Sequence, residues 1–287
     1  MKKPKISVLL PVYKSEHLLN KIFAQSLFAN SSVNFELIIY DNGGTDKSLR
    51  PWRAREIDVY PDVCCGYEII GDGKNIGLNQ AINECAKVAK GDWFYLCHTD
   101  MHLLPGWDTA LLEATKNHKP DTLLLCSRSI EKSSHVPTQL LKDFGTNIES
   151  FEKEKLMKFF ETYDDKGIVT SYRMPYFFHR GLWEKMTEFN RKNGFGNGGV
   201  DNFYFSFATD NDLFFTAYEV KVRKFWMVNS SVIYHLSGHS NNQQDVDKDS
   251  KDPYLYLVNK WKQFGYNIDM NIDASEQRLV PWSVKIK

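Results

Sequence analysis

Residues 93–107 read WFYLCHTDMHLLPGW, in which large apolar residues are followed closely by His98, Asp100 and His102. An apolar run that ends in polar residues is typical of a buried strand whose carboxyl end presents side chains at the edge of a core. Those polar groups either hold the fold, as Asp100 would by capping the turn before Pro105, or hold a ligand.

Similar apolar runs flank this stretch, at residues 6–10, 37–40, 67–70 and 122–126. Between two of them, residues 75–91 carry apolar side chains at helical spacing and end at a glycine. Strands that alternate with helices predict an α/β fold with a mostly parallel sheet flanked by helices. Ligands of such sheets bind beyond the carboxyl ends of the strands, where Asp41 and Asp100 are expected.

The rest of the chain is less regular. Residues 130–165 are charged with a helical period, which predicts a helical insertion rather than a new domain. We expect one domain over residues 1–240. Residues 241–287 are expected to contain a mobile loop (241–252), an amphipathic helix over about 253–264 and a tail of no assigned structure.

A glycine-rich loop at residues 194–199 can approach a ligand closely through its backbone. Its aromatic neighbours Phe195, Phe203 and Tyr204 are equally consistent with an acceptor platform and with ordinary core. The polar 241–252 loop is a candidate lid over a bound donor.

Composition excludes several classes of protein. The 287 residues include 36 basic and 36 acidic side chains, so no net field draws the chain to nucleic acid or an anionic membrane. Five cysteines without a CxxC pair favour reduced thiols, mostly in the core. The N-terminal apolar run is short and contains Pro11, and no stretch approaches the ~20 apolar residues of a membrane span. We therefore expect a soluble, cytoplasmic protein.

Further acidic residues are candidates for chemistry. Asp41 begins the turn DNGGTD, where a structural Asx turn and a contact with a nucleotide base or ribose are both consistent with the residues. Asp210 and Asp212 open a helical pattern, where acidic residues favour the helix dipole. We interpret Asp212 in that structural way. Asp210 stays a candidate because the segment VIYHLSGHS, with His235, follows it.

A resemblance rests on the order of these segments. The chain contains, in sequence, KISVLLPVYK, ELIIYDNGGTDKS, KNIGLNQAIN, AKGDWFYLCHTDMHLLPGW, FFHRGLWEKM, TDNDLFF and VIYHLSGHS. Together they resemble the motifs of family-two glycosyltransferases with the GT-A fold, including the DxD-type strand end and the EDxDL helix start. The likeness spans about residues 5–240, and the ordered set is far more specific than any one motif.

By position, the resemblance implies roles for individual residues. Asp41 matches the carboxylate that contacts the nucleotide base. Asp100 matches the metal-binding aspartate of the DxD element, and His235 matches the late histidine that ligates the metal or touches the diphosphate. Asp210 matches the catalytic base. The other positions implied to bind the donor are Pro11, Tyr13, Asn75, His98 and Thr99.

Two positions depart from the family pattern. His98 stands where many members have the first aspartate, and Thr209 replaces the usual glutamate before Asp210. These departures put the ribose contact, the metal preference and the acceptor contacts in question. Whether His98, His102 or His239 also bind metal stays open.

The resemblance implies an inverting, metal-dependent glycosyltransferase of the hexosyltransferase type. It would move a sugar from a nucleoside-diphosphate sugar to a hydroxyl of a glycan, glycoconjugate or protein. The expected cofactor is Mn²⁺ or Mg²⁺, and family habit alone favours a uridine-diphosphate (UDP) sugar. No nucleic acid partner is expected, and contact with a membrane would be peripheral.

Two rival functions belong to other classes. A nucleotidyltransferase is disfavoured because PVYKSEHLLN is not a glycine-rich, basic loop. A non-catalytic sugar-nucleotide or glycan-binding module is consistent with the atypical HTD, and a test for donor hydrolysis would separate it from an enzyme.

Overall fold

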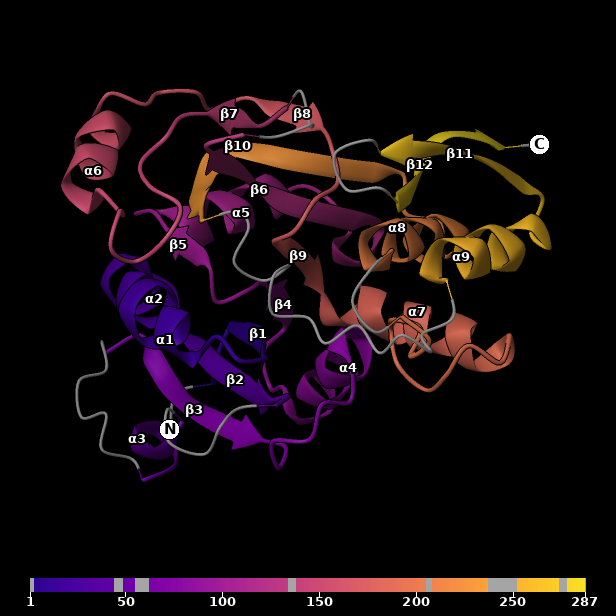
Figure 1. The fold of residues 1–287 in the computed structure, drawn as a ribbon, viewed down its shortest axis with the longest axis horizontal. Helices are drawn as coiled ribbons and strands as arrows, with labels where there is room; N and C mark the ends of the chain where they lie inside the picture. The colour runs from indigo at the N-terminus through magenta and orange to yellow at the C-terminus, as the bar shows by residue number, and fades with distance from the viewer. Residues whose placement is uncertain are drawn as a thin grey trace.

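A computed structural model describes residues 3–43, 49–54, 62–133, 138–204, 208–236, 252–273 and 278–286, with side chains to residue 268. Within this part, ten strands form one sheet in the order β3-β2-β1-β4-β9-β6-β10-β5, with β7 beside β6 and β8 beside β10 (Figure 1). The strands of this sheet are β1 (Ile6–Val12), β2 (Phe35–Asp41), β3 (Cys64–Ile70), β4 (Trp93–Leu96), β5 (Met101–Leu103), β6 (Leu123–Glu131), β7 (Leu140–Leu141), β8 (Ile168–Thr170), β9 (Tyr176–His179) and β10 (Lys224–His235).

The direction of the strands determines where the site forms. β1 pairs in parallel with β2 and with β4, and β6 pairs in parallel with β10. β9 is antiparallel to both β4 and β6, so β4 and β6 run the same way. The carboxyl ends of β1, β2, β4, β6 and β10 therefore lie along one edge of the sheet. All five strands predicted from the sequence are present, which confirms the predicted α/β class.

Helices cover both faces of this sheet. They are α1 (Glu16–Leu18), the π-helical turn η1 (Leu19–Phe23), α2 (Ala24–Asn30), α3 (Arg50–Arg53), α4 (Leu78–Val88), α5 (Trp107–Thr115), the 3₁₀ turn η2 (Pro120–Thr122), α6 (Lys153–Glu161), α7 (Arg180–Lys192), α8 (Thr209–Glu219) and α9 (Pro253–Lys262). Successive residues of β1 pack on opposite faces: Val8 joins the core under α2 and α5, while Leu9 joins the core under α4, α7 and α8. Two covered faces explain why apolar residues predominate on both faces of the parallel strands.

Two regions differ from the sequence prediction. Among the described residues of the predicted helical insertion, α6 alone is helical. Leu140–Leu141 forms β7 beside β6, because strand pairing overrides the local helical period there. The unassigned tail forms a hairpin of β11 (Tyr266–Asp273) and β12 (Arg278–Ile286). The predicted helix after residue 252 is confirmed as α9, and the side chain of Asp252 caps it.

Three further predictions concern the cysteines, membrane spans and the loop after residue 240. All five cysteines are free thiols, and Cys85, Cys97 and Cys126 are buried. Across the described residues, no helix has the length and apolar character needed to cross a membrane. Residues 241–251 lie outside the described part, so the lid and the domain boundary at 240 stay predictions.

Candidate functional site

Three side chains meet where β4, β6 and β10 end. Asp100 follows β4, Glu131 is the last residue of β6 and His235 is the last residue of β10. The amide of Leu236 donates a hydrogen bond of 2.9 Å to the carbonyl of Asp100, and His235 pairs with Met101 across β10 and β5. Strand pairing thus brings these distant parts of the chain together. We call Asp100, Glu131 and His235 the edge cluster.

The His235 ring lies between two carboxylates. Its Nε2 is 3.4 Å from Asp100 Oδ2, and its Nδ1 is 3.3 Å from Glu131 Oε1. A carboxylate accepts, so Nδ1 donates to Glu131, and this contact orients Nε2 toward Asp100. Sequence analysis missed Glu131 because it assigned residues 130–165 to an insertion, whereas β6 extends through residue 131.

The two carboxylates also set the charge of this histidine. Burial acts to lower the pKa of His235, but the negative charges of Asp100 and Glu131 outweigh it and raise the pKa to about 10. Burial acts to raise the pKa of Asp100, and the positive His235 outweighs that effect, so the carboxyl pKa is lowered. At neutral pH the ring is therefore an imidazolium beside an ionised aspartate.

The edge cluster leaves polar atoms without hydrogen bonds. Asp100 is 1% exposed, yet neither of its carboxylate oxygens has a hydrogen-bond partner among the described residues. The buried Nε2 of His98 lacks one as well. Since buried polar atoms are rarely unpaired, such atoms indicate a site for a polar ligand. Elsewhere in the described chain, as here, no group of three His, Cys, Asp or Glu side chains is arranged for a metal. The residues fit a cation that takes most of its ligands from phosphate oxygens and water.

The other histidines lie differently. Within the described residues neither ring nitrogen of the buried His102 has a hydrogen-bond partner, and the ring meets Phe151 edge-on with centroids 5.1 Å apart. Burial, followed by the positive charge of Lys153, lowers the pKa of His102 to about 4, and neither Asp100 nor His235 contributes to that shift. His239 lies outside the described residues.

Several predicted donor-binding residues meet at the ends of β1 and β2. The ring of Tyr13 and the Cβ of Asn75 both lie beside Gly43: an added Cβ at that glycine would be 2.6 Å from the ring and 3.7 Å from Asn75. Gly43 has φ +131°, a conformation that favours glycine. Asp41, at the end of β2, forms an ion pair of 2.7 Å with Arg53. Sequence analysis did not single out Arg53.

The remaining two predicted residues are placed by neighbouring elements. Pro11 lies in β1 opposite Tyr40. Thr99 donates a hydrogen bond of 2.8 Å to the hydroxyl of Ser15, which precedes α1.

Asp210 occupies the first turn of α8. The preceding Thr209 is buried, and its hydroxyl donates to Asn79 of α4 at 2.9 Å, so the residue that replaces the family's glutamate ties α8 to α4. The charge of Asp210 acts to raise the pKa of His98 and that of Tyr176. Asp210 therefore lies within electrostatic range of the HTD segment.

Asp212, two residues later, has a different environment. It is 1% exposed, and it accepts hydrogen bonds from Lys260 of α9 at 3.0 Å and from the indole of Trp261 at 2.8 Å. Lys260 also pairs with the buried Asp201 at 2.9 Å. Burial raises the pKa of Asp212, and Lys260 opposes that shift. These contacts agree with the structural interpretation of Asp212. We call Asp201, Asp212 and Lys260 the α8–α9 cluster.

The proposed aromatic platform belongs to the same part of the core. Tyr204 is fully buried, and Phe203 stacks on Tyr256 of α9 with ring centroids 3.6 Å apart. Gly198 lies against Asn83, where an added Cβ would be 2.0 Å from the amide oxygen. A platform at Tyr204 is therefore wrong, and the close approach at Gly198 is to the protein itself.

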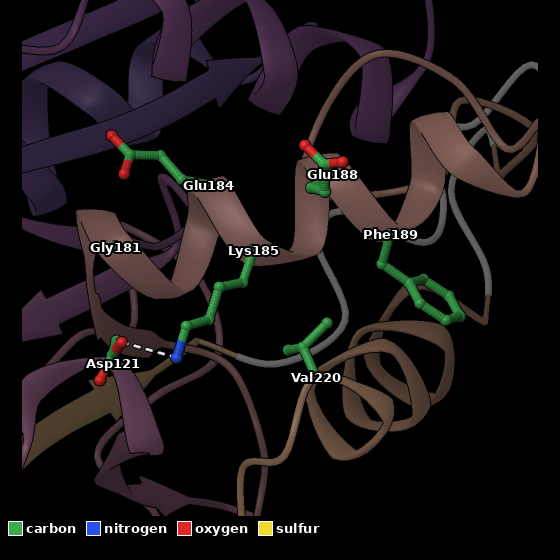
Figure 2. A pocket seen from close by; sticks show the side chains of 7 residues that line it. All are labelled: Asp121, Gly181, Glu184, Lys185, Glu188, Phe189 and Val220. Atoms are coloured by element: carbon green, nitrogen blue, oxygen red, sulfur yellow. Dashed lines mark ion pairs between the residues drawn. The ribbon is translucent and has the colours of Figure 1, made fainter.

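A separate pocket of about 570 Å³ lies outside this region. Figure 2 shows Lys185 reaching from α7 toward Asp121, with which it forms an ion pair of 2.6 Å. Asp121 precedes β6, whereas Glu131 ends it, so the pocket lies toward the opposite end of that strand.

Known proteins place this architecture in a class. A crystal structure of S. aureus TarS 1–349 in complex with UDP-GlcNAc aligns with 82% of this chain and 61% of that chain, at TM-score 0.52 and 15% identity. A structure of GalNAc-T7 with UDP, GalNAc and Mn²⁺ aligns with 81% of this chain and 44% of that chain, at TM-score 0.55 and 11% identity. At such identities the likeness concerns the fold, which is the GT-A fold.

The family follows from the sequence comparison. Residues 7–180 match the profile described as glycosyl transferase family 2, so the chain belongs to that family. A dolichol-phosphate mannosyltransferase of Pyrococcus furiosus is 30% identical over 114 residues, which are 39% of this chain and 30% of that protein.

Proposed function

We propose that this protein is an inverting, metal-dependent glycosyltransferase that uses a nucleoside-diphosphate sugar and a hydroxyl acceptor. The observation that carries the proposal is the buried Asp100 carboxylate, which has no hydrogen-bond partner among the described residues and lies at the sheet edge where His235, Tyr13 and Asn75 also lie. Family membership supports it, as do GT-A neighbours whose structures contain UDP-GlcNAc, or UDP with Mn²⁺.

Asp100 and His235 would hold a divalent cation, Mn²⁺ or Mg²⁺, whose charge offsets the charge that builds up on the departing diphosphate. His235 must lose the proton on Nε2 to bind a metal. The contact with Glu131 keeps the Nε2 of His235 directed toward Asp100 whether the ring is protonated or neutral. At the nucleotide end, a base bound at Asp41 would share that carboxylate with Arg53.

Asp210 would act as the base. The acceptor oxygen forms a bond to the anomeric carbon while the bond from that carbon to the diphosphate oxygen breaks, and the hydroxyl proton passes to the Asp210 carboxylate. Because attack comes from the face opposite the leaving group, the anomeric configuration inverts.

Donor binding is tested by thermal unfolding with UDP, GDP and TDP, each with and without Mn²⁺. Ligand at a hundredfold excess over its Kd should add about 2.7 kcal/mol to the free energy of unfolding. We expect a metal-dependent shift with one nucleotide, UDP by family habit, that Asp100→Ala abolishes. Asp92→Ala, which removes a carboxylate that pairs with Lys3 at the surface, is the matched control.

Catalysis is tested by the same panel followed by a transfer assay. Asp210→Asn should lower transfer by roughly 10²–10⁴-fold and keep the nucleotide shift, because general-base catalysis contributes that much. NMR of product from an α-linked donor should show a β-linkage. A retained α-linkage would remove Asp210 as the direct base, and binding without transfer or hydrolysis would favour the non-catalytic module.

A further inference from the structure

A groove of about 500 Å³ opens beside α8, between that helix, the segment after β8 and the start of β10. Its wall is aromatic: Tyr172 stacks on Phe214 with ring centroids 4.4 Å apart and an interplanar angle of 26°, and Phe214 meets Phe225 at 4.5 Å. Tyr172 and Phe214 are only partly buried. Such a wall offers flat apolar area together with polar hydroxyl groups, as binding sites for sugars require.

One side of α8 leads from the groove toward the proposed catalytic base, which is not itself among the residues that line the groove. Asp210, Phe214 and Tyr218 are spaced four residues apart on α8, so they lie along one side of the helix. This row is about 12 Å long at 1.5 Å per residue, which is longer than a single sugar ring. Burial raises the pKa of Tyr172, and the two charges that act on it are those of Arg173 and Asp210, so both lie near that ring.

The charge of the groove is positive although the whole chain is neutral. Arg173 and Arg223 line it, and none of the described residues that line it is acidic. Arg223 is held in place, because it donates to the carbonyls of Tyr218 and Val222 and lies 3.8 Å from the Tyr218 ring. Arg173 is exposed, and its guanidinium has no hydrogen-bond or ion-pair partner within the described residues. A guanidinium in this position can bind a carboxylate or phosphate with two donors.

We propose that this groove binds the acceptor and that the acceptor is an acidic oligosaccharide. Its sugar rings would stack on Tyr172 and Phe214, its reacting hydroxyl would face Asp210, and a carboxylate or phosphate on the sugar chain would pair with Arg173. The role as acceptor site rests on the proposed function, whereas the binding of acidic glycans can be measured without it.

The test is an array of acidic oligosaccharides, bearing uronic acids or sugar phosphates, and neutral oligosaccharides of matched length. We expect the wild type to bind acidic members preferentially. Arg173→Gln should weaken this binding by about tenfold or more, the loss of one charge-assisted hydrogen bond. Phe214→Ala should weaken it too. Arg191→Gln removes the same charge from the exposed surface of α7 and should have no effect.

Other results would overturn the proposal. They are binding confined to neutral glycans, no binding to any glycan, or equal binding by Arg173→Gln and Arg191→Gln. Vesicles that contain a polyprenyl phosphate provide a second arm: capture there that needs Arg173, with no glycan bound, would assign the groove to a lipid phosphate instead. The change in thermal unfolding when nucleotide is added to the same samples distinguishes the proposed glycan groove from the proposed transferase function. Nucleotide binding without acidic-glycan binding contradicts the groove alone, and the reverse contradicts the proposed transferase.

Discussion

The edge cluster and the α8–α9 cluster contain the same kinds of charged side chain, but the two clusters differ in how many hydrogen bonds those side chains make. Each has two carboxylates and one cationic side chain, largely removed from water. In the α8–α9 cluster, the Lys260 ammonium lies 2.9 and 2.8 Å from its two carboxylates, and an indole and two phenols complete the set. In the edge cluster the contacts are 3.3 and 3.4 Å, and the Asp100 carboxylate has no hydrogen bond within the described chain.

This difference separates a structural charge cluster from a binding site. Residue type does not distinguish them, since each cluster contains two carboxylates and one cationic side chain. The number of satisfied hydrogen bonds does: a complete cluster stabilises the fold, and an incomplete one can bind a ligand.

The largest effect on stability should come from removing the cation of the α8–α9 cluster. Lys260→Met leaves two buried carboxylates without their cation, and we expect the free energy of unfolding to fall by about 3–5 kcal/mol in urea titrations. Lys262→Met on the exposed side of the same helix is the control and should change little. Equal losses in both variants would mean that the α8–α9 cluster contributes no more than surface charge.

The next effect concerns the orientation of His235. Glu131→Gln should weaken Mn²⁺ binding, measured by electron paramagnetic resonance without nucleotide turnover, by about 10–100-fold, because partners behind a metal-binding histidine typically contribute that much. The exposed Glu113→Gln is the matched control. Unchanged Mn²⁺ affinity in Glu131→Gln would leave Glu131 as a structural neighbour only.

A smaller effect should follow from changing the incomplete cluster in metal-free protein. Asp100→Asn removes the charge of a carboxylate that makes one long ion pair, so we expect a loss of about 1 kcal/mol, near the net value of a single hydrogen bond. Urea titration in the presence of chelator measures it. A loss as large as that of Lys260→Met would show that the edge cluster is complete without a metal.

An effect of similar size concerns His102, a buried histidine in neither cluster. Its pKa of about 4 in the folded protein lies below the ordinary value of about 6.5 expected when unfolded, so the unfolded chain takes up the proton first as pH falls. Stability should therefore fall by about 1 kcal/mol between pH 7 and 5.5 through this residue. The difference between wild type and His102→Leu measures it, with the exposed His17→Leu as control. A pH dependence unchanged in His102→Leu would contradict the assignment.

Sequence reasoning predicted what local pattern determines. The strands and α4 followed from apolar periodicity, and the ordered motifs placed Asp100, His235, Tyr13 and Asn75 at one edge of a sheet. It did not predict partners that only the folded chain brings together. Arg53 meets Asp41, Glu131 meets His235, and Lys260 meets Asp212 across 12, 104 and 48 positions respectively. No spacing rule indicates such pairs, because they depend on how strands and helices pack.

The attachment of α8 to α9 has a consequence for dissection of the chain. The family match ends at residue 180, but the helix that carries Asp210 is held by Lys260, eighty positions later. A version shortened before Pro253 would retain every motif and lose Lys260, the counter-ion of Asp201 and Asp212. The segment that contains the motifs is therefore not expected to fold without α9. A design that moves this site into another protein would have to include that helix.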